Sequence, residues 1–146
     1  MKLSTRSRYA VRLMVDLAVH DGNGPVLLKD AAARQDVSEK YLSQIVIPLR
    51  AAGLLQSTRG PRGGYRLGKA SRDITVADIV EALDGSICLV DCLGDQRLCD
   101  RIGVCPTREV WKLLGDRVRQ TLHGVTLAEL SGREREKAQN DSMGHI

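Results

Sequence analysis

The chain has 146 residues, of which 42% are hydrophobic, 3% are aromatic and none is Phe. This length fits one domain or a small domain with an appended helix, and a core of Leu, Val, Ile and Ala favours helices. No apolar run is long enough to cross a bilayer, and no apolar segment follows the basic N-terminus, so we expect no membrane partner, no signal peptide and a cytoplasmic location.

The formal net charge of +4 is unevenly distributed. Residues 1–72 hold 13 Lys and Arg against 5 Asp and Glu, a net of +8. Residues 73–146 hold 9 against 13, a net of −4. A basic first half points to a polyanionic partner, although a solubilising surface would give the same balance.

The first half predicts three helices in close succession. Thr5 is the expected N-cap of the first, which has apolar residues on one face and Arg6, Arg8 and Arg12 on the other. A short helix is expected around residues 29–34, followed by a tight connection at 35–37. Ser38 then caps a third helix, which Pro48 should kink and Gly53 should end.

A small β-hairpin should follow, with strands at 54–58 and 65–67 and a basic, glycine-rich tip between them. Thr75 and Asp78 resemble a capping box for a helix at about 76–83, which Gly85 closes. The expected organisation is a DNA-binding domain at residues 1–85, a cysteine loop at 86–106, a long amphipathic helix and a short one within 107–130, and a disordered polar tail at 131–146.

Helix, short helix, tight turn, helix and hairpin follow the order of a winged helix-turn-helix. The fold class is therefore mainly α with a small β-hairpin. Ser38 lies at the start of the predicted recognition helix, where Glu39, Lys40, Tyr41, Ser43 and Gln44 follow, and Glu, Lys and Gln side chains can each pair with a base edge. On the wing, Arg59 and Arg62 next to Gly63 suit a minor groove, and Arg6, Arg8 and Arg12 suit phosphates.

All four cysteines lie within 18 residues, at Cys88, Cys92, Cys99 and Cys105. Scattered core residues or long-range disulfides would be distributed along the chain. One short polar loop with four thiols predicts a single bound metal or iron–sulfur cluster. Zinc sites prefer two closely spaced pairs, and only Cys88 and Cys92 are close, so zinc ranks below iron–sulfur. Cys88 lies in an apolar segment and is equally explained as a core residue.

Several segments resemble the IscR/NsrR/CymR family of bacterial winged-helix repressors, and the resemblance covers residues 1–123. The segments are residues 3–17, 38–42, 49–54 (Leu-Arg-Ala-Ala-Gly-Leu), 59–67 (Arg-Gly-Pro-Arg-Gly-Gly-Tyr-Arg-Leu) and 74–76, together with the cysteine loop up to Trp111. The resemblance implies a homodimer held by the long C-terminal helix and bound to a palindromic promoter site. It also implies a 2Fe–2S or 4Fe–4S cluster on Cys92, Cys99 and Cys105.

The fourth ligand does not follow from the resemblance. One branch of the family uses a His three residues after the last cysteine, where this chain has Arg108. Another uses an Asp at the position of Arg8, and a third a His at the position of Arg12. Cys88 is the first alternative, followed by the carboxylates of Glu109, Asp91 and Asp95 and by an exogenous ligand or thiol.

These features predict a DNA-binding transcriptional regulator, expected to be a repressor, that senses iron–sulfur, redox or nitric oxide status through its cluster. A redox or electron-transfer protein, or a DNA-binding protein with a structural zinc, are the alternatives. An enzyme is not expected, because no phosphate-binding loop, nucleophile motif or convergent pair of carboxylates is found in the sequence.

Overall fold

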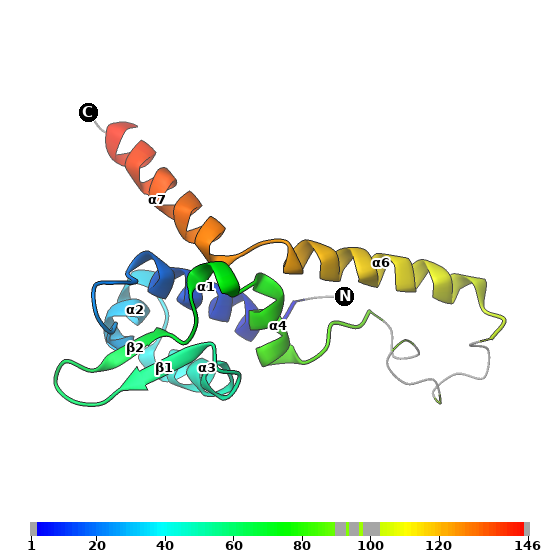
Figure 1. The fold of residues 1–146 in the computed structure, drawn as a ribbon, viewed down its shortest axis with the longest axis horizontal. Helices are drawn as coiled ribbons and strands as arrows, with labels where there is room; N and C mark the ends of the chain where they lie inside the picture. Colours follow the sequence, from blue (N-terminus) through cyan, green and yellow to red (C-terminus); the bar gives the residue numbers. More distant parts are fainter. Residues whose placement is uncertain (1–2, 90–92, 94–96, 98–102, 145–146) are drawn as a thin grey trace.

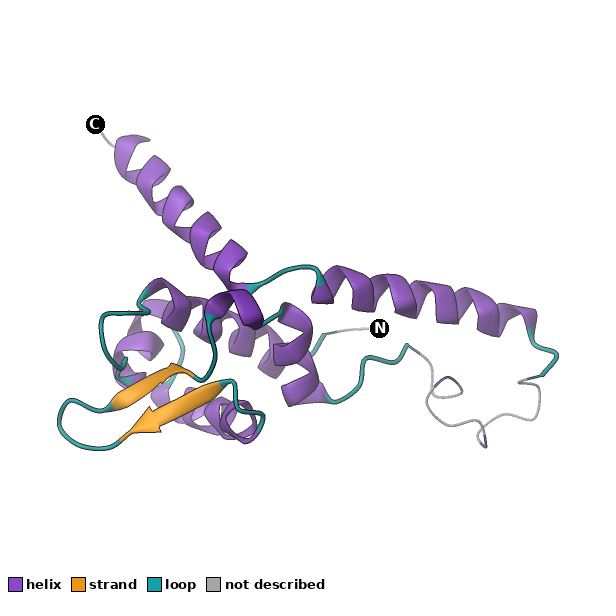
Figure 2. Ribbon diagram, viewed as in Figure 1, coloured by secondary structure: helices purple, strands orange, loops and turns teal. Residues whose placement is uncertain are grey.

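The computed structural model describes residues 3–89, 93, 97 and 103–144. A cluster of helices carries a two-stranded antiparallel sheet on one side, and two long helices extend from it (Figures 1 and 2). In chain order the elements are α1 (Thr5–Val19), α2 (Leu28–Gln35), α3 (Glu39–Ala51), β1 (Leu55–Thr58), β2 (Gly64–Leu67), the 3-10 turn η1 (Ser71–Asp73), α4 (Val76–Asp84), α6 (Pro106–His123) and α7 (Leu127–Gly144). The predicted fold class, mainly α with a small hairpin, is confirmed.

Side-chain caps set the starts of α1, α3 and α4. Ser38 accepts a hydrogen bond from the backbone N–H of Tyr41 at 3.1 Å, as predicted. Thr75 and Asp78 form the expected reciprocal capping box at the start of α4. The predicted cap of α1 is wrong by one residue. Ser4, in extended conformation, accepts from the N–H of Ser7 at 3.0 Å, and Thr5 is already helical.

The core lies where α1 crosses the other helices. Helix α1 contacts α2, α3, α4, α7 and β2, so it is the central element of the domain. Its apolar face packs against the inner faces of α3 and α4 and against the first residue of α7. The most completely buried large side chains are those of Leu13, Met14, Leu42, Ile45, Leu49, Ile74, Ile79 and Leu127.

The hairpin is tied to the helical domain through its second strand. Strand β1 pairs with β2 in the register Leu55↔Leu67 to Thr58↔Gly64. Val26, just before α2, exchanges two backbone hydrogen bonds of 2.8 Å with Tyr65. This approach requires glycine at position 64, where φ is +145° and a Cβ would lie 2.4 Å from the carbonyl oxygen of Val26.

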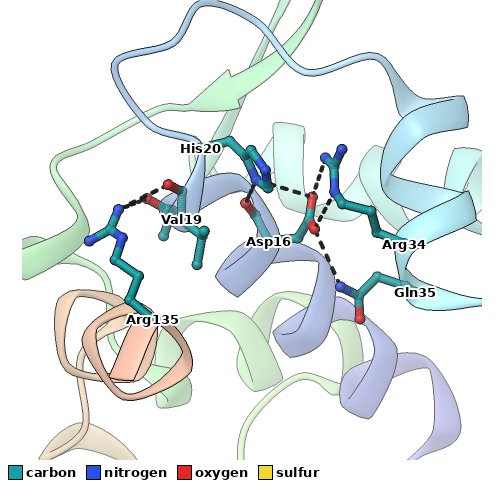
Figure 3. A network of polar contacts seen from close by, with 7 residues as sticks. Asp16, Val19, His20, Arg34, Gln35 and Arg135 are labelled. Carbon is teal, nitrogen blue, oxygen red and sulfur yellow. Dashed lines mark hydrogen bonds and ion pairs between the residues drawn. The ribbon is translucent and has the colours of Figure 1, made fainter. Parts of the chain in front are cut away.

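Helix α7 corrects the prediction of a disordered tail. The chain is helical to Gly144, although residues 133–144 are exposed. Residues 133–143 contain no Gly, Pro or β-branched residue and several strong helix formers, so the segment favours a helix locally. Its first turns are anchored by buried Leu127 and Ser131, and Arg135 donates through Nη2 to the carbonyl oxygens of Ala18 and Val19 at 3.2 and 2.9 Å (Figure 3).

Helix α6 contacts α4 near its C-terminal end and otherwise projects away from the domain (Figure 1). Only Gly115 among its residues is buried. Val110, Trp111, Leu113 and Leu114 remain 57%, 42%, 59% and 48% exposed. Within the described ranges, no helix combines the length and the hydropathy required of a bilayer-crossing segment.

Candidate nucleic-acid interface and cysteine loop

The exposed face of α3 is polar at its N-terminal end. Glu39, Lys40, Ser43 and Gln44 are all exposed, and the Ser43 hydroxyl donates to the carbonyl oxygen of Lys40 at 2.6 Å. Ser38 is also exposed, because it precedes the first helical turn. These side chains occupy the positions from which a recognition helix reaches base edges.

Tyr41 differs from its neighbours on α3. Its ring is half-buried and meets the ring of Tyr9 edge-to-face, with centroids 5.7 Å apart and planes at 88°. The guanidinium of Arg12 lies 4.9 Å from the centroid of the Tyr9 ring. Tyr41 therefore joins the start of α3 to α1 and packs within the domain, unlike its exposed polar neighbours.

The wing presents its two arginines to solvent. Arg59 and Arg62 are both exposed at the tip of the hairpin. Gly63 between the strands is buried, and a Cβ there would lie 2.1 Å from the carbonyl oxygen of Thr58. The glycine therefore keeps the wing thin and holds the tip arginines at its outer end.

The arginines of α1 divide into two kinds. Arg6 and Arg8, near the helix start, are exposed. Arg12, although exposed, is held on α2, where it donates to Gln35 Oε1 at 3.1 Å and to the carbonyl oxygen of Gln35 at 2.8 Å. Arg12 is thus engaged within the domain, whereas Arg6 and Arg8 extend from its surface.

A carboxylate at the end of α4 holds the start of α1. Asp84 accepts from the Ser4 hydroxyl at 2.7 and 2.9 Å and from the buried Ser7 hydroxyl at 2.6 Å. Burial acts to raise the pKa of Asp84, but the hydrogen bonds from Ser7 and Ser4 and the charge of Arg6 outweigh it, and the net pKa is below its ordinary value. Sequence reasoning missed this contact, because 77 residues separate Ser7 from Asp84.

A second polar network lies between α1 and α2 (Figure 3). Asp16 is 3% exposed and accepts from Nε and Nη2 of Arg34 at 2.8 Å each. Gln35 donates to the same carboxylate at 3.4 Å, and Nδ1 of His20 lies 2.8 Å from the carbonyl oxygen of Asp16. The hydrogen bond to Asp16 raises the pKa of Arg34. An Asp among apolar positions of α1 was the available sequence signal, because a buried charge needs a partner.

The described ends of the cysteine loop are Cys88, which is exposed, and Cys105, which is half-buried at the N-cap of α6. Cys105 Sγ lies 3.1 Å from the hydroxyl oxygen of Thr107. Cys92 and Cys99 lie outside the described residues, and so do two of the carboxylates considered as ligands, Asp91 and Asp95. Among the residues that are described, no three His, Cys, Asp or Glu side chains converge as metal ligands would.

Arg108 lies one turn after Cys105. Its Nε is buried and has no hydrogen-bond partner within the described part of the chain. A small pocket of about 260 Å³ opens beside it, lined by Gly103, Val104, Cys105, Pro106, Arg108 and Glu109. A buried guanidinium nitrogen without an acceptor is costly, so this place favours an anionic group.

Comparison with known proteins agrees with this geometry. Residues 3–133 match the Rrf2 family, described as "Iron-dependent Transcriptional regulator". The chain is 42% identical over 130 residues to protein rrf2 of Nitratidesulfovibrio vulgaris, covering 89% of this chain and 87% of that protein. It is 40% identical over 152 residues to the HTH-type transcriptional regulator IscR of Photobacterium profundum, covering 98% and 88%.

Two solved structures share both fold and sequence with the chain. CymR, the global cysteine regulator of B. subtilis, superposes with a TM-score of 0.79 at 40% identity, covering 91% of this chain and 98% of CymR. IscR of T. potens superposes with a TM-score of 0.76 at 40% identity, covering 95% and 91%. The resemblance seen in the sequence is confirmed, and the chain belongs to the Rrf2 family of transcriptional regulators, which are not enzymes.

Proposed function

We propose that this regulator is a cytoplasmic homodimeric repressor whose affinity for a palindromic promoter site depends on an iron–sulfur cluster. The observation that carries the DNA part is the exposed polar stripe of α3 beside the arginine-tipped wing. Lys40, Ser43 and Gln44 would read base edges in the major groove, with Ser38 and Glu39 at the helix start. Arg59 and Arg62 would enter a minor groove beside Gly63, while Arg6 and Arg8 would neutralise phosphates.

The cluster part rests on the chemistry of the loop. Cys92, Cys99 and Cys105 would hold the cluster, because thiolates are soft, anionic ligands for iron. The buried Nε of Arg108 beside Cys105, which has no hydrogen-bond partner among the described residues, fits an anionic group at this place. Arg108 cannot itself ligate, so Cys88, four residues before Cys92, is the proposed fourth ligand. When bound, the cluster would supply a group that responds to oxygen, nitric oxide or redox state.

The described contacts suggest how the loop reaches the DNA-binding surface. The loop starts directly after Asp84, which holds Ser4 and Ser7 at the start of α1. Arg6 and Arg8 lie on that first turn and a half of α1. A rearranged loop would therefore alter the position of the phosphate-binding arginines, and allosteric coupling of this kind typically changes affinity by about 5- to 150-fold.

Dimerisation is proposed through α6. Four large apolar side chains stay exposed on this projecting helix, Val110, Trp111, Leu113 and Leu114. An unpartnered apolar helix face is unfavourable in water, and a second α6 would cover it symmetrically. A two-fold dimer would present two α3 helices to two half-sites, which is why we expect a palindrome.

A second candidate function is regulation by cysteine or another thiol-related signal without a cluster. Its support is the match to CymR, which is named a global cysteine regulator. In that case the loop cysteines would act as thiols, and the purified protein would carry neither iron nor sulfide.

The DNA part can be tested by selection from a library of random duplexes with the full-length protein, purified without oxygen. We expect an inverted repeat to be enriched, with affinity that falls steeply as salt rises, because phosphate contacts release counterions. Enrichment of no duplex would overturn the proposal, and enrichment of a single half-site would overturn its dimeric form.

A further inference from the structure

One large apolar side chain of α3 points away from the core. Leu42, Ile45, Val46 and Leu49 of this helix are at most 2% exposed, whereas Ile47 is 65% exposed. Isolated exposed apolar residues are common on protein surfaces, so exposure alone decides nothing. The position of Ile47 relative to the exposed polar residues of α3 is what indicates a function.

Ile47 continues, about one turn further along α3, the exposed stripe assigned to base recognition. It follows Lys40 by seven residues, which is nearly two helical turns, so the two side chains lie about 20° apart around the helix axis. It also follows Ser43 by four residues and Gln44 by three, the spacings at which helical side chains are neighbours. Around the helix axis Ile47 therefore lies between Ser43 and Gln44, and along the axis it lies next to them, one turn further toward the C-terminal end of α3.

We propose that Ile47 reads thymine, by packing its side chain on the 5-methyl group of a thymine in the major groove; this rests on the proposed binding of DNA. Among the four bases, thymine alone presents an apolar group there, and apolar side chains recognise it by contact. Burial of both groups removes apolar surface from water, which stabilises the complex only where that methyl is present.

The charge around Ile47 favours DNA over a second copy of the chain as the occupant of this surface. Lys40 and Arg50 are exposed on the same helix, and Arg59 is exposed on the wing. Two copies meeting at this face would bring like charges together, which is unfavourable at an interface, whereas a polyanion would be attracted. Ile47 is thus an apolar contact inside a basic surface.

The test removes the thymine methyl group from each half-site of the DNA and the larger part of the Ile47 side chain from the protein, separately and together. A duplex is first selected from random sequences with the wild-type protein. Symmetric pairs of thymines in it are then replaced by deoxyuridine, which lacks only the 5-methyl group, and dissociation constants are measured by fluorescence anisotropy at fixed salt. Ile47→Ala is compared with wild type, and Met143→Ala, which changes an exposed apolar residue near the end of α7, is the matched control.

With wild type and Met143→Ala, replacement of one symmetric pair of thymines by deoxyuridine should weaken binding about 16-fold. This corresponds to about fourfold for the one methyl group lost in each half-site. Ile47→Ala should bind the thymine duplex more weakly and show no further loss with uracil at that pair. Two results would overturn the inference while leaving DNA binding intact: a selected site at which no uracil pair matters, or a full uracil effect that persists in Ile47→Ala. A change of oligomeric state in Ile47→Ala would instead assign the residue to a contact between copies. Enrichment of no duplex would remove the proposed function and this inference together.

Discussion

Arg34 on α2 holds the buried carboxylate of Asp16 on α1 through two hydrogen bonds of 2.8 Å each. Removal of the guanidinium leaves that carboxylate with the longer bond from Gln35. A buried charge that loses its partner is costly, and a hydrogen bond to a charged group contributes about 1.5–3 kcal/mol to stability. We therefore expect Arg34→Ala to lower the free energy of unfolding by about 2 kcal/mol in urea titrations at neutral pH.

The matched control is Lys29→Ala on the exposed side of the same helix, which should change stability by less than about 0.5 kcal/mol. A second comparison tests whether the loss of stability comes from the unpaired carboxylate of Asp16 or from a change in helix α2 itself. Replacement of Asp16 by Asn in the Arg34→Ala background should recover part of the loss, because a neutral amide is cheaper to leave buried. Equal stability of wild type and Arg34→Ala would show that the network contributes nothing.

The Asp84 contact makes a prediction about pH. Because the folded-state pKa of Asp84 lies below its ordinary value, ionised Asp84 contributes stability above the unfolded pKa of about 4. This contribution is lost as pH falls through the lower, folded-state pKa. Because Asp84 is exposed and screened by solvent, Asp84→Asn should be less stable than wild type by at most about 1 kcal/mol at pH 7, and the difference should shrink below about pH 4.

Ser7→Ala tests whether the Ser7 hydroxyl is the partner through which Asp84 contributes this stability. The effects of Ser7→Ala and Asp84→Asn should be less than additive, since either change removes the same hydrogen bond. A stability difference that stays constant from pH 7 to pH 3, or strictly additive effects, would contradict the assignment.

The dimer prediction concerns the exposed face of α6. Leu114→Glu should shift the protein from dimer to monomer in sedimentation experiments, because it places a charge within the apolar face formed with Val110 and Trp111. Lys112→Glu, an exposed change on the same helix, should leave the dimer intact. A monomeric wild type, or a Leu114→Glu variant that remains dimeric, would rule out this interface.

The wing prediction separates DNA binding from the cysteine loop. Arg59→Ala should weaken binding to the selected duplex and reduce the dependence of log K on log salt, because each protomer then brings one positive charge fewer to the DNA. Its iron and sulfide content should equal that of wild type. Arg72→Ala, an exposed change on η1, should alter neither the binding to DNA nor the iron and sulfide content. Loss of iron in Arg59→Ala would contradict the separate roles assigned to wing and loop.

The helices of the DNA-binding domain were predictable because each carries a local signal. Apolar spacing, the Ser38 cap and the Thr75–Asp78 capping box depend on residues within four positions of one another. The start of α1 was misplaced by one residue, since Ser4 and Thr5 are both good caps and the choice of Ser4 is accompanied by its bond to distant Asp84.

The features that could not be predicted from the sequence are contacts between elements that are far apart in the chain. Helical spacing places Tyr41 on the apolar face of α3, but its partner, the ring of Tyr9 on α1, is known only from the structure. The segment after Ser131 was expected to be disordered because it is polar, although its composition also favours a helix. The bonds by which Arg135 anchors it to the last carbonyls of α1 join residues 116 and 117 positions apart. Local composition describes what a segment prefers, and tertiary contacts decide which preference is realised.

We propose that a cluster on the cysteine loop controls the affinity for DNA. The most direct test is the dissociation constant for the selected duplex, measured without oxygen on protein of known iron and sulfide content, before and after removal of the cluster. We expect a brown protein that contains iron and sulfide, which should be lost in Cys99→Ser and diminished in Cys88→Ala. Removal of the cluster should change the affinity at least about fivefold. A colourless protein with one equivalent of zinc, or equal affinities in the two states, would contradict it.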